Sequence, residues 1–64
     1  MKVNELKGAI VKNGYTQRDI AKKLGIAPKT FYCKMKRGNF TSNEIKVMIN
    51  ELHIDNPLDI FFAD

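Results

Sequence analysis

Cysteine, proline, tryptophan and long apolar runs are scarce or absent in this 64-residue chain. Its single cysteine, Cys33, cannot form an internal disulfide and fits a reducing compartment. No apolar run approaches the roughly 20 residues that span a bilayer, and the polar N-terminus does not resemble a signal peptide. No segment alternates apolar and polar residues, so we expect no strands. These absences favour a small, cytoplasmic, all-α domain.

Residues that could act in catalysis or hold a metal are equally few. The thiol of Cys33 and the imidazole of His53 lie in segments of opposite charge, and the chain has neither a glycine-rich phosphate loop nor a His and Cys cluster. We therefore expect no enzyme activity, catalytic residue, cofactor, metal or small-molecule ligand. We interpret Cys33 as a small surface residue rather than a reactive thiol, and His53 as a structural residue at a helix end.

Positive charge is concentrated in the middle of the chain. Residues 16–38 carry seven Lys or Arg and one Asp, a net charge of +6, and residues 1–15 carry +2. Residues 39–64 carry one Lys and five acidic residues, a net charge of −4. This asymmetry indicates a phosphate-rich partner for the middle segment, and we expect the acidic C-terminal third to point away from the phosphates.

Capping signals and apolar spacing predict five helices in one domain, residues 1–64. A first helix carries Val3, Leu6 and Ile10 and ends at Asn13-Gly14. A second helix is predicted at 16–24, from the capping pair Thr16 and Asp19 and a terminal Gly25. A third is predicted at 28–37, because Pro28 suits a first helical turn and Gly38 a helix end. The capping box Thr41-Ser42-Asn43-Glu44 starts a fourth helix, with Ile45, Met48, Ile49 and Leu52 on one face.

The fifth predicted helix is short, with Asn56 as its cap and Pro57 at its first position. We expect Leu58, Phe61 and Phe62 to turn inward. Adjacent aromatic residues cannot both do so, however, which leaves one of the two phenylalanines for a dimer contact.

The second and third predicted helices are separated only by a tight connection at Gly25. Phe31 and Met35, four positions apart, give the third helix a buried edge. Its opposite edge then presents Lys29, Cys33 and Lys36, with Tyr32 and Arg37 beside them. A short edge that is basic and partly aromatic suits a DNA groove.

These residues resemble a known family. The run Gln17-Arg18-Asp19-Ile20-Ala21-Lys22-Lys23-Leu24-Gly25-Ile26, continued by Thr30-Phe31 and Lys34-Met35, is similar to the lambda-like Cro and CI repressor class of helix-turn-helix proteins, and closest to short phage Cro-type members. The resemblance extends over Phe40-Thr41, Glu44-Ile45 and Pro57 to Phe62. It implies a lambda-repressor-like fold, with the helix-turn-helix at the second and third helices. Ala27 departs from the family, because many members have a Ser or Thr cap at this position. The absence of this cap weakens the start of the helix.

Candidate DNA contacts follow from the resemblance and from the residue types. The resemblance implies a phosphate contact for the glutamine that opens helix two and base contacts for early residues of helix three. The expected base contacts are Pro28, Lys29, Tyr32 and Cys33. The expected phosphate contacts are Gln17, Arg18, Lys34, Lys36, Arg37 and Asn39. Lys29 is the first choice for a base, because lysine can donate to guanine O6 and N7. For Tyr32, a half-buried packing role is an equal alternative.

The sequence therefore predicts a sequence-specific regulator of transcription that binds double-stranded DNA, with helix three in the major groove. By resemblance, it is a Cro-like repressor of a phage or prophage in a bacterial cell. Because one domain of this size reads few base pairs, we expect a weak homodimer, in solution or only on DNA, that occupies a palindromic operator. Two alternatives stay open: an antitoxin or other partner-binding protein that uses its acidic third, and an architectural or excision factor that bends DNA.

Overall fold

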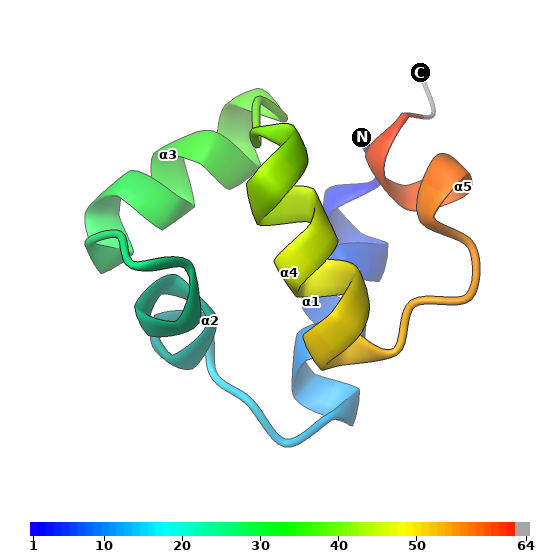
Figure 1. Ribbon diagram of the computed structural model, residues 1–64, viewed down its shortest axis with the longest axis horizontal. Coiled ribbons are helices and arrows are strands. Elements are labelled where there is room, and N and C mark those ends of the chain that lie inside the picture. Colours follow the sequence, from blue (N-terminus) through cyan, green and yellow to red (C-terminus); the bar gives the residue numbers. More distant parts are fainter. Residues whose placement is uncertain (63–64) are drawn as a thin grey trace.

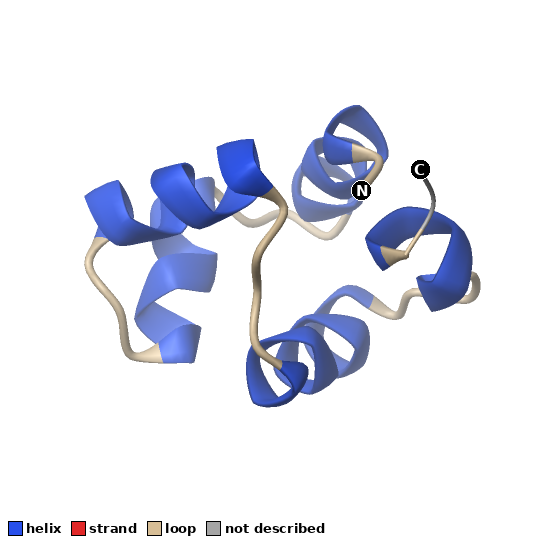
Figure 2. Ribbon diagram, turned by 90° about the horizontal axis from the view of Figure 1, so that it is seen from above, coloured by secondary structure: helices blue, strands red, loops and turns tan. Residues whose placement is uncertain are grey.

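Five α-helices follow one another in the computed structural model, which describes residues 1–62 (Figure 1). They are α1 (Val3–Lys12), α2 (Gln17–Leu24), α3 (Pro28–Arg37), α4 (Ser42–Leu52) and α5 (Pro57–Phe61). Residues 1–62 contain no strand, and short loops join the helices (Figure 2). The predicted all-α fold of five helices is confirmed. None of these helices has the length and apolar character needed to cross a membrane.

Two capping boxes start α2 and α4 as the sequence predicts. The Asp19 amide donates to Thr16 Oγ1 at 3.1 Å, and the Thr16 amide donates to Asp19 Oδ2 at 2.8 Å. Thr41 and Glu44 form the same pair of hydrogen bonds at the start of α4, at 3.2 and 2.8 Å. Each box satisfies amides that the first helical turn leaves without a partner, so both helix starts are fixed locally.

The predicted cap of α5 is wrong. The side chain of Asn56 makes no capping hydrogen bond, because its backbone, at φ −126° and ψ 61°, lies outside the extended region that a capping residue adopts. Pro57 occupies the first helical position as expected, and the Ile60 amide donates to the Asn56 carbonyl at 3.2 Å. The start of α5 is thus set by proline and backbone, without a side-chain cap.

Left-handed residues end three helices. Gly25 after α2 has φ 73° and Gly38 after α3 has φ 67°, as the sequence predicts. After α4 this position is held by His53 at φ 51°, the one non-glycine residue with positive φ in residues 1–62. His53 therefore has a structural position at a helix end.

The core draws two buried apolar side chains from each helix. On α1, α3 and α4 the two are four positions apart, so they lie on one helical face. The ten residues are Leu6, Ile10, Ile20, Ala21, Phe31, Met35, Met48, Leu52, Ile60 and Phe61. No polar or charged residue is buried among the described residues. The core itself is therefore stabilised by hydrophobic burial.

The inward face of α5 differs from the predicted one. Phe61 is buried as expected, but Leu58 and Phe62 are 74% and 64% exposed, and Ile60 is buried in their place. Because Leu58 and Phe62 are four positions apart, they share one face, and burying Ile60 with Phe61 turns that face outward. The inference that only one of the adjacent phenylalanines can point inward is confirmed.

The helix pair α2–α3 and helix α5 lie at opposite ends of the view in Figure 1. The Lys2 amide donates to the Ile60 carbonyl at 2.7 Å, which joins the start of the chain to α5. Seen from above, α1 and α4 lie on opposite sides of the molecule (Figure 2). This arrangement leaves the outer side of α3 uncovered by the other helices.

Candidate nucleic-acid interface

The connection between α2 and α3 is short and closed by backbone hydrogen bonds. The Gly25 amide donates to the Lys22 carbonyl at 3.1 Å, and the Ile26 amide donates to the Ala21 carbonyl at 3.0 Å. These bonds end α2 in a left-handed turn, and only Ile26 and Ala27 remain before α3 begins. Since Ala21 is small and fully buried, α3 can pack closely on α2. The two helices form the tight pair that the sequence predicts.

The outer face of α3 carries four of the predicted contact residues in one row. Lys29, Tyr32, Cys33 and Lys36 are all exposed and follow helical spacing, so the row extends about 10 Å along the helix. Tyr32 is 45% exposed, and its ring meets the Phe31 ring edge-on, with centroids 6.4 Å apart. This ring contact agrees with the packing role of Tyr32, and its contact with a base stays a prediction.

The other predicted contacts lie around this row. Pro28, at the first position of α3, and Gln17, at the first position of α2, are half-buried. Arg18 and Arg37 are exposed. Asn39 is also exposed, and its amide donates to the Lys34 carbonyl at 3.2 Å just beyond α3. Gln17 lines one hollow with Tyr32 and Lys36, and Arg18 lines another with Pro28, so the start of α2 lies beside α3.

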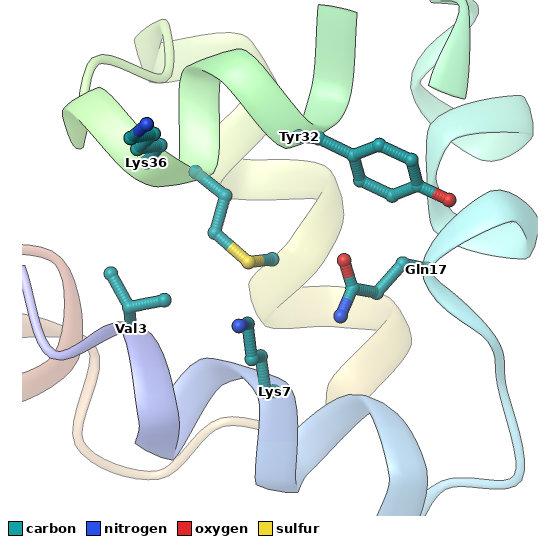
Figure 3. A pocket seen from close by; sticks show the side chains of 6 residues that line it. Val3, Lys7, Gln17, Tyr32 and Lys36 are labelled. Atoms are coloured by element: carbon teal, nitrogen blue, oxygen red, sulfur yellow. The ribbon is translucent and has the colours of Figure 1, made fainter. Parts of the chain in front are cut away.

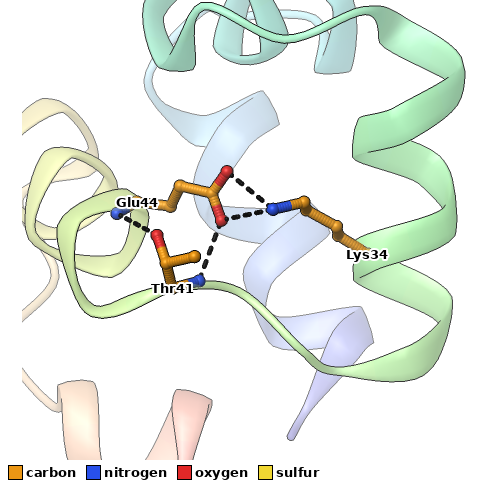
Figure 4. Close-up of polar contacts among 3 residues, drawn as sticks. All are labelled: Lys34, Thr41 and Glu44. Atoms are coloured by element: carbon orange, nitrogen blue, oxygen red, sulfur yellow. Dashed lines mark hydrogen bonds and ion pairs between the residues drawn. The ribbon is translucent and has the colours of Figure 1, made fainter.

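Lys34 differs from the other predicted phosphate contacts because it is paired within the protein. Its Nζ donates to both carboxylate oxygens of Glu44 at 2.9 Å, and the same carboxylate accepts from the Thr41 amide (Figure 4). The Lys34 side chain is 24% exposed and that of Glu44 only 12%. Lys34 therefore joins α3 to the capping box of α4, and its charge is already neutralised there.

Two carboxyl groups in the capping boxes have lowered pKa values. Burial raises the pKa of Glu44, but the hydrogen bonds from the Thr41 amide and from Lys34 outweigh it, so this pKa lies below its ordinary value. For Asp19, the hydrogen bond from the Thr16 amide is the main cause that lowers the pKa. Both carboxylates are consequently ionised at neutral pH, when they cap their helices.

A second cation of the basic segment is also paired. Lys23 Nζ lies 3.5 Å from Glu51 Oε1 and 5.4 Å from the centre of the Tyr15 ring. The Tyr15 hydroxyl in turn donates to Glu51 Oε2 at 3.1 Å. This group ties the end of α2 to α4.

Two carboxylates of the acidic C-terminal third thus contact the basic helices, and its orientation relative to the phosphates stays a prediction. Glu51 pairs with Lys23 because α4 packs against α2, and Glu44, at the start of α4, pairs with Lys34 of α3. Five exposed cations on α2 and α3 have no carboxylate within 4 Å in the part of the chain that the structure describes. They are Arg18, Lys22, Lys29, Lys36 and Arg37.

An open hollow of about 540 Å³ lies where α1, α2 and α3 meet (Figure 3). Val3 and Lys7 line it from α1, and Gln17 lines it from the first turn of α2. From α3 it is lined by Tyr32, Met35 and Lys36. Figure 3 shows the Lys7 and Gln17 side chains directed toward the same space. The hollow thus joins two predicted phosphate contacts to a lysine of α1.

The sequence does not identify Lys7 as a site residue. The sequence shows only that it follows the core residue Leu6 on a helix with apolar spacing. No local signal says which side of α1 faces α3, because that depends on how the helices pack. The position of Lys7 is thus a result of the tertiary structure.

Comparisons of the chain with protein-family models, with curated proteins and with solved structures find no match.

Proposed function

We propose that this protein is a non-enzymatic regulator of transcription that binds double-stranded DNA in a sequence-specific way, as a Cro-type repressor of a phage or prophage. The observation that carries the proposal is the tight α2–α3 pair, whose outer row presents Lys29 and Lys36 without carboxylate partners among the described residues. The resemblance of residues 17–26 to the lambda-like class adds the regulatory role.

The dimensions of α3 fit a DNA groove. The major groove admits one α-helix, and the row from Lys29 to Lys36 is long enough to cross a few base pairs. Lys29 lies near the start of α3, where a helix-turn-helix protein contacts base edges, and Lys36 and Arg37 lie near its end. Lys29, with Pro28, Tyr32 and Cys33, then contributes sequence choice. Lys36 and Arg37, with Gln17, Arg18 and Asn39, contribute affinity for the backbone.

One copy of α3 reads too few base pairs for an operator, so we propose that two copies bind an inverted repeat. The two half-sites would lie about one DNA turn, roughly 34 Å, apart. The exposed Leu58 and Phe62 at α5 are the candidate contact between the copies, and they lie away from α3. Such a contact is small, so we expect the dimer to be weak in solution.

A selection from randomised duplexes, followed by binding titrations over a salt series, tests the function. Lys29→Ala should weaken binding to the selected duplex by about 1–3 kcal/mol and relax the preference at one base pair. Lys36→Ala should weaken binding to every duplex and reduce the salt slope by about one. Lys46→Ala is the matched control, because Lys46 is an exposed lysine of α4 and its loss removes the same charge.

Three outcomes would count against the proposal. If the wild-type protein binds no duplex even in dilute buffer, DNA binding itself is wrong. If Lys46→Ala weakens binding as much as Lys36→Ala, α3 is not the binding element. If Lys29→Ala and Lys36→Ala lose affinity uniformly across sequences, Lys29 does not read a base.

The partner-binding alternative depends on the acidic third of the chain. Because Glu44 and Glu51 are paired with Lys34 and Lys23, these two carboxylates are not free to bind a basic partner. This pairing favours the DNA-binding function. Copurification of a neighbouring protein in fixed stoichiometry would reverse that preference, and strong bending of DNA with poor sequence choice would favour an architectural factor.

A further inference from the structure

We infer that the hollow between α1, α2 and α3 binds one phosphate of the DNA backbone and that Lys7 of α1 is one of its ligands. This inference rests on the proposed function and extends the DNA-binding surface to a helix outside the helix-turn-helix. It also gives Lys7 and Gln17, whose side chains are directed toward the same space, a common partner (Figure 3).

The chemistry of the hollow suits an anion. Its polar lining residues are Lys7, Lys36, Gln17 and Tyr32, and no acidic residue lines it. All four side chains can donate hydrogen bonds to a phosphate oxygen. The nearest acidic residue along α1, Glu5, pairs instead with Lys2 at 3.5 Å. Neither lysine of the hollow has a carboxylate within 4 Å among residues 1–62.

The position of the hollow points to a phosphate of DNA rather than to a free anion. Tyr32 and Lys36 belong both to the hollow and to the outer row of α3. A DNA strand that borders the major groove entered by α3 would therefore pass directly over the hollow. The apolar floor from Val3 and Met35 offers no further polar ligand that would enclose a small anion on all sides. An open hollow suits one group of a continuous chain better than an isolated ion.

The contact has a measurable consequence in the salt dependence of binding. Each phosphate that a protein neutralises releases counterions and adds about 0.9 to the slope of log K against log salt. Because Lys36 lines the same hollow, Lys7→Gln should reduce the slope by no more than about 0.9 and weaken binding by up to about tenfold in roughly 0.1 M salt, equally for all duplex sequences.

Lys12→Gln provides the matched control. Lys12 is an exposed lysine on the same helix, and it borders a different hollow, with Asn13 and His53. The Lys12→Gln substitution removes the same charge from α1, so it reports the general effect of lowering the net charge. We expect its slope to stay at the wild-type value, and Lys7→Arg to restore most of the lost affinity. Circular dichroism should show unchanged helix content, because both lysines are exposed.

The outcomes separate this inference from the proposed function. If the wild type binds duplex and Lys36→Ala lowers the slope, but Lys7→Gln and Lys12→Gln behave alike, the inference is wrong and DNA binding stands. If inorganic phosphate at constant ionic strength shifts the α1 resonances in the wild type but duplex does not, the hollow is a free-anion site and the inference is also wrong. If the wild type binds no duplex, both proposals fail.

Discussion

Lysines that look equivalent in the sequence have different environments in the protein. Lys34 and Lys36 are two positions apart on α3, yet Lys34 is held by both oxygens of Glu44 while Lys36 is exposed beside the hollow. The difference follows from the helical repeat, because residues two apart point to different sides. Charge at one position of α3 therefore stabilises the fold, and charge at another is free for a ligand.

The charge of Glu44 should make stability depend on pH. Its folded pKa lies below the ordinary value of 4.5, so its ionised form stabilises the native state above that pH. As the pH falls through the lowered folded pKa, this contribution is lost. Glu44→Gln keeps the capping hydrogen bond but removes the charge, and should cost about 1 kcal/mol at pH 7, a fall in Tm of about 4–8 °C. Calorimetry at pH 7 and at pH 3 should show the difference from wild type shrink.

Glu5→Gln is the control for this measurement. Its carboxylate is exposed and pairs with Lys2 at 3.5 Å on the surface, so its loss should change Tm little at either pH. A wild-type advantage over Glu44→Gln that is equally large at pH 3 would show that the carboxylate charge is not its source.

Among the helices, α3 lacks the side-chain cap that stabilises the starts of α2 and α4. Thr16 and Thr41 cap those two helices, whereas Ala27 has no side chain that could accept a hydrogen bond from the first turn of α3. The backbone of Ala27, at φ −67° and ψ 148°, already has the extended conformation of a capping residue. The site is therefore ready for a cap that the sequence omits.

Ala27→Ser should stabilise the protein. The serine hydroxyl can accept from an amide of the first turn without any change in the backbone, which is worth about 1 kcal/mol and raises Tm by about 4–8 °C. Thermal unfolding followed by circular dichroism measures the effect. Ala27→Val lacks an acceptor and should give no gain. Equal Tm changes for the serine and valine variants would show that capping is not responsible.

At the scale of the whole molecule, the surface is divided by charge and by polarity. The unpaired cations lie on α2 and α3 at one end, and the exposed Leu58 and Phe62 lie at α5 at the other. This separation allows one copy to contact DNA and another copy at the same time. It is the geometry that binding to an inverted repeat requires.

The double variant Leu58→Ser/Phe62→Ser should therefore weaken dimer assembly on a palindromic duplex by about tenfold and leave the affinity for a single half-site unchanged. The reason is the loss of apolar area that the contact would bury. Analytical ultracentrifugation with and without the selected duplex measures the stoichiometry. Val11→Ser is the control, because Val11 is 73% exposed but belongs to α1. A one-to-one complex of the wild type on a palindrome would contradict the dimer.

The five helices can be predicted from the sequence, because their signals are local. Each helix start or end depends on residues within one turn, such as Thr16 with Asp19, or Gly25 with its left-handed backbone. The row Lys29, Cys33 and Lys36 also followed from helical spacing alone. The one wrong cap, Asn56, belongs to the shortest helix, where few residues share the signal.

Which charges are free and which apolar residues are exposed depends on how the helices pack, and the sequence does not predict it. Glu44 contacts Lys34 ten positions away and Glu51 contacts Lys23 twenty-eight positions away, and both pairings depend on how α4 packs. The same packing turns Leu58 and Phe62 outward and brings Lys7 beside Gln17. Contacts between helices arise from burying ten apolar side chains together, and no single helix carries that information in its own sequence.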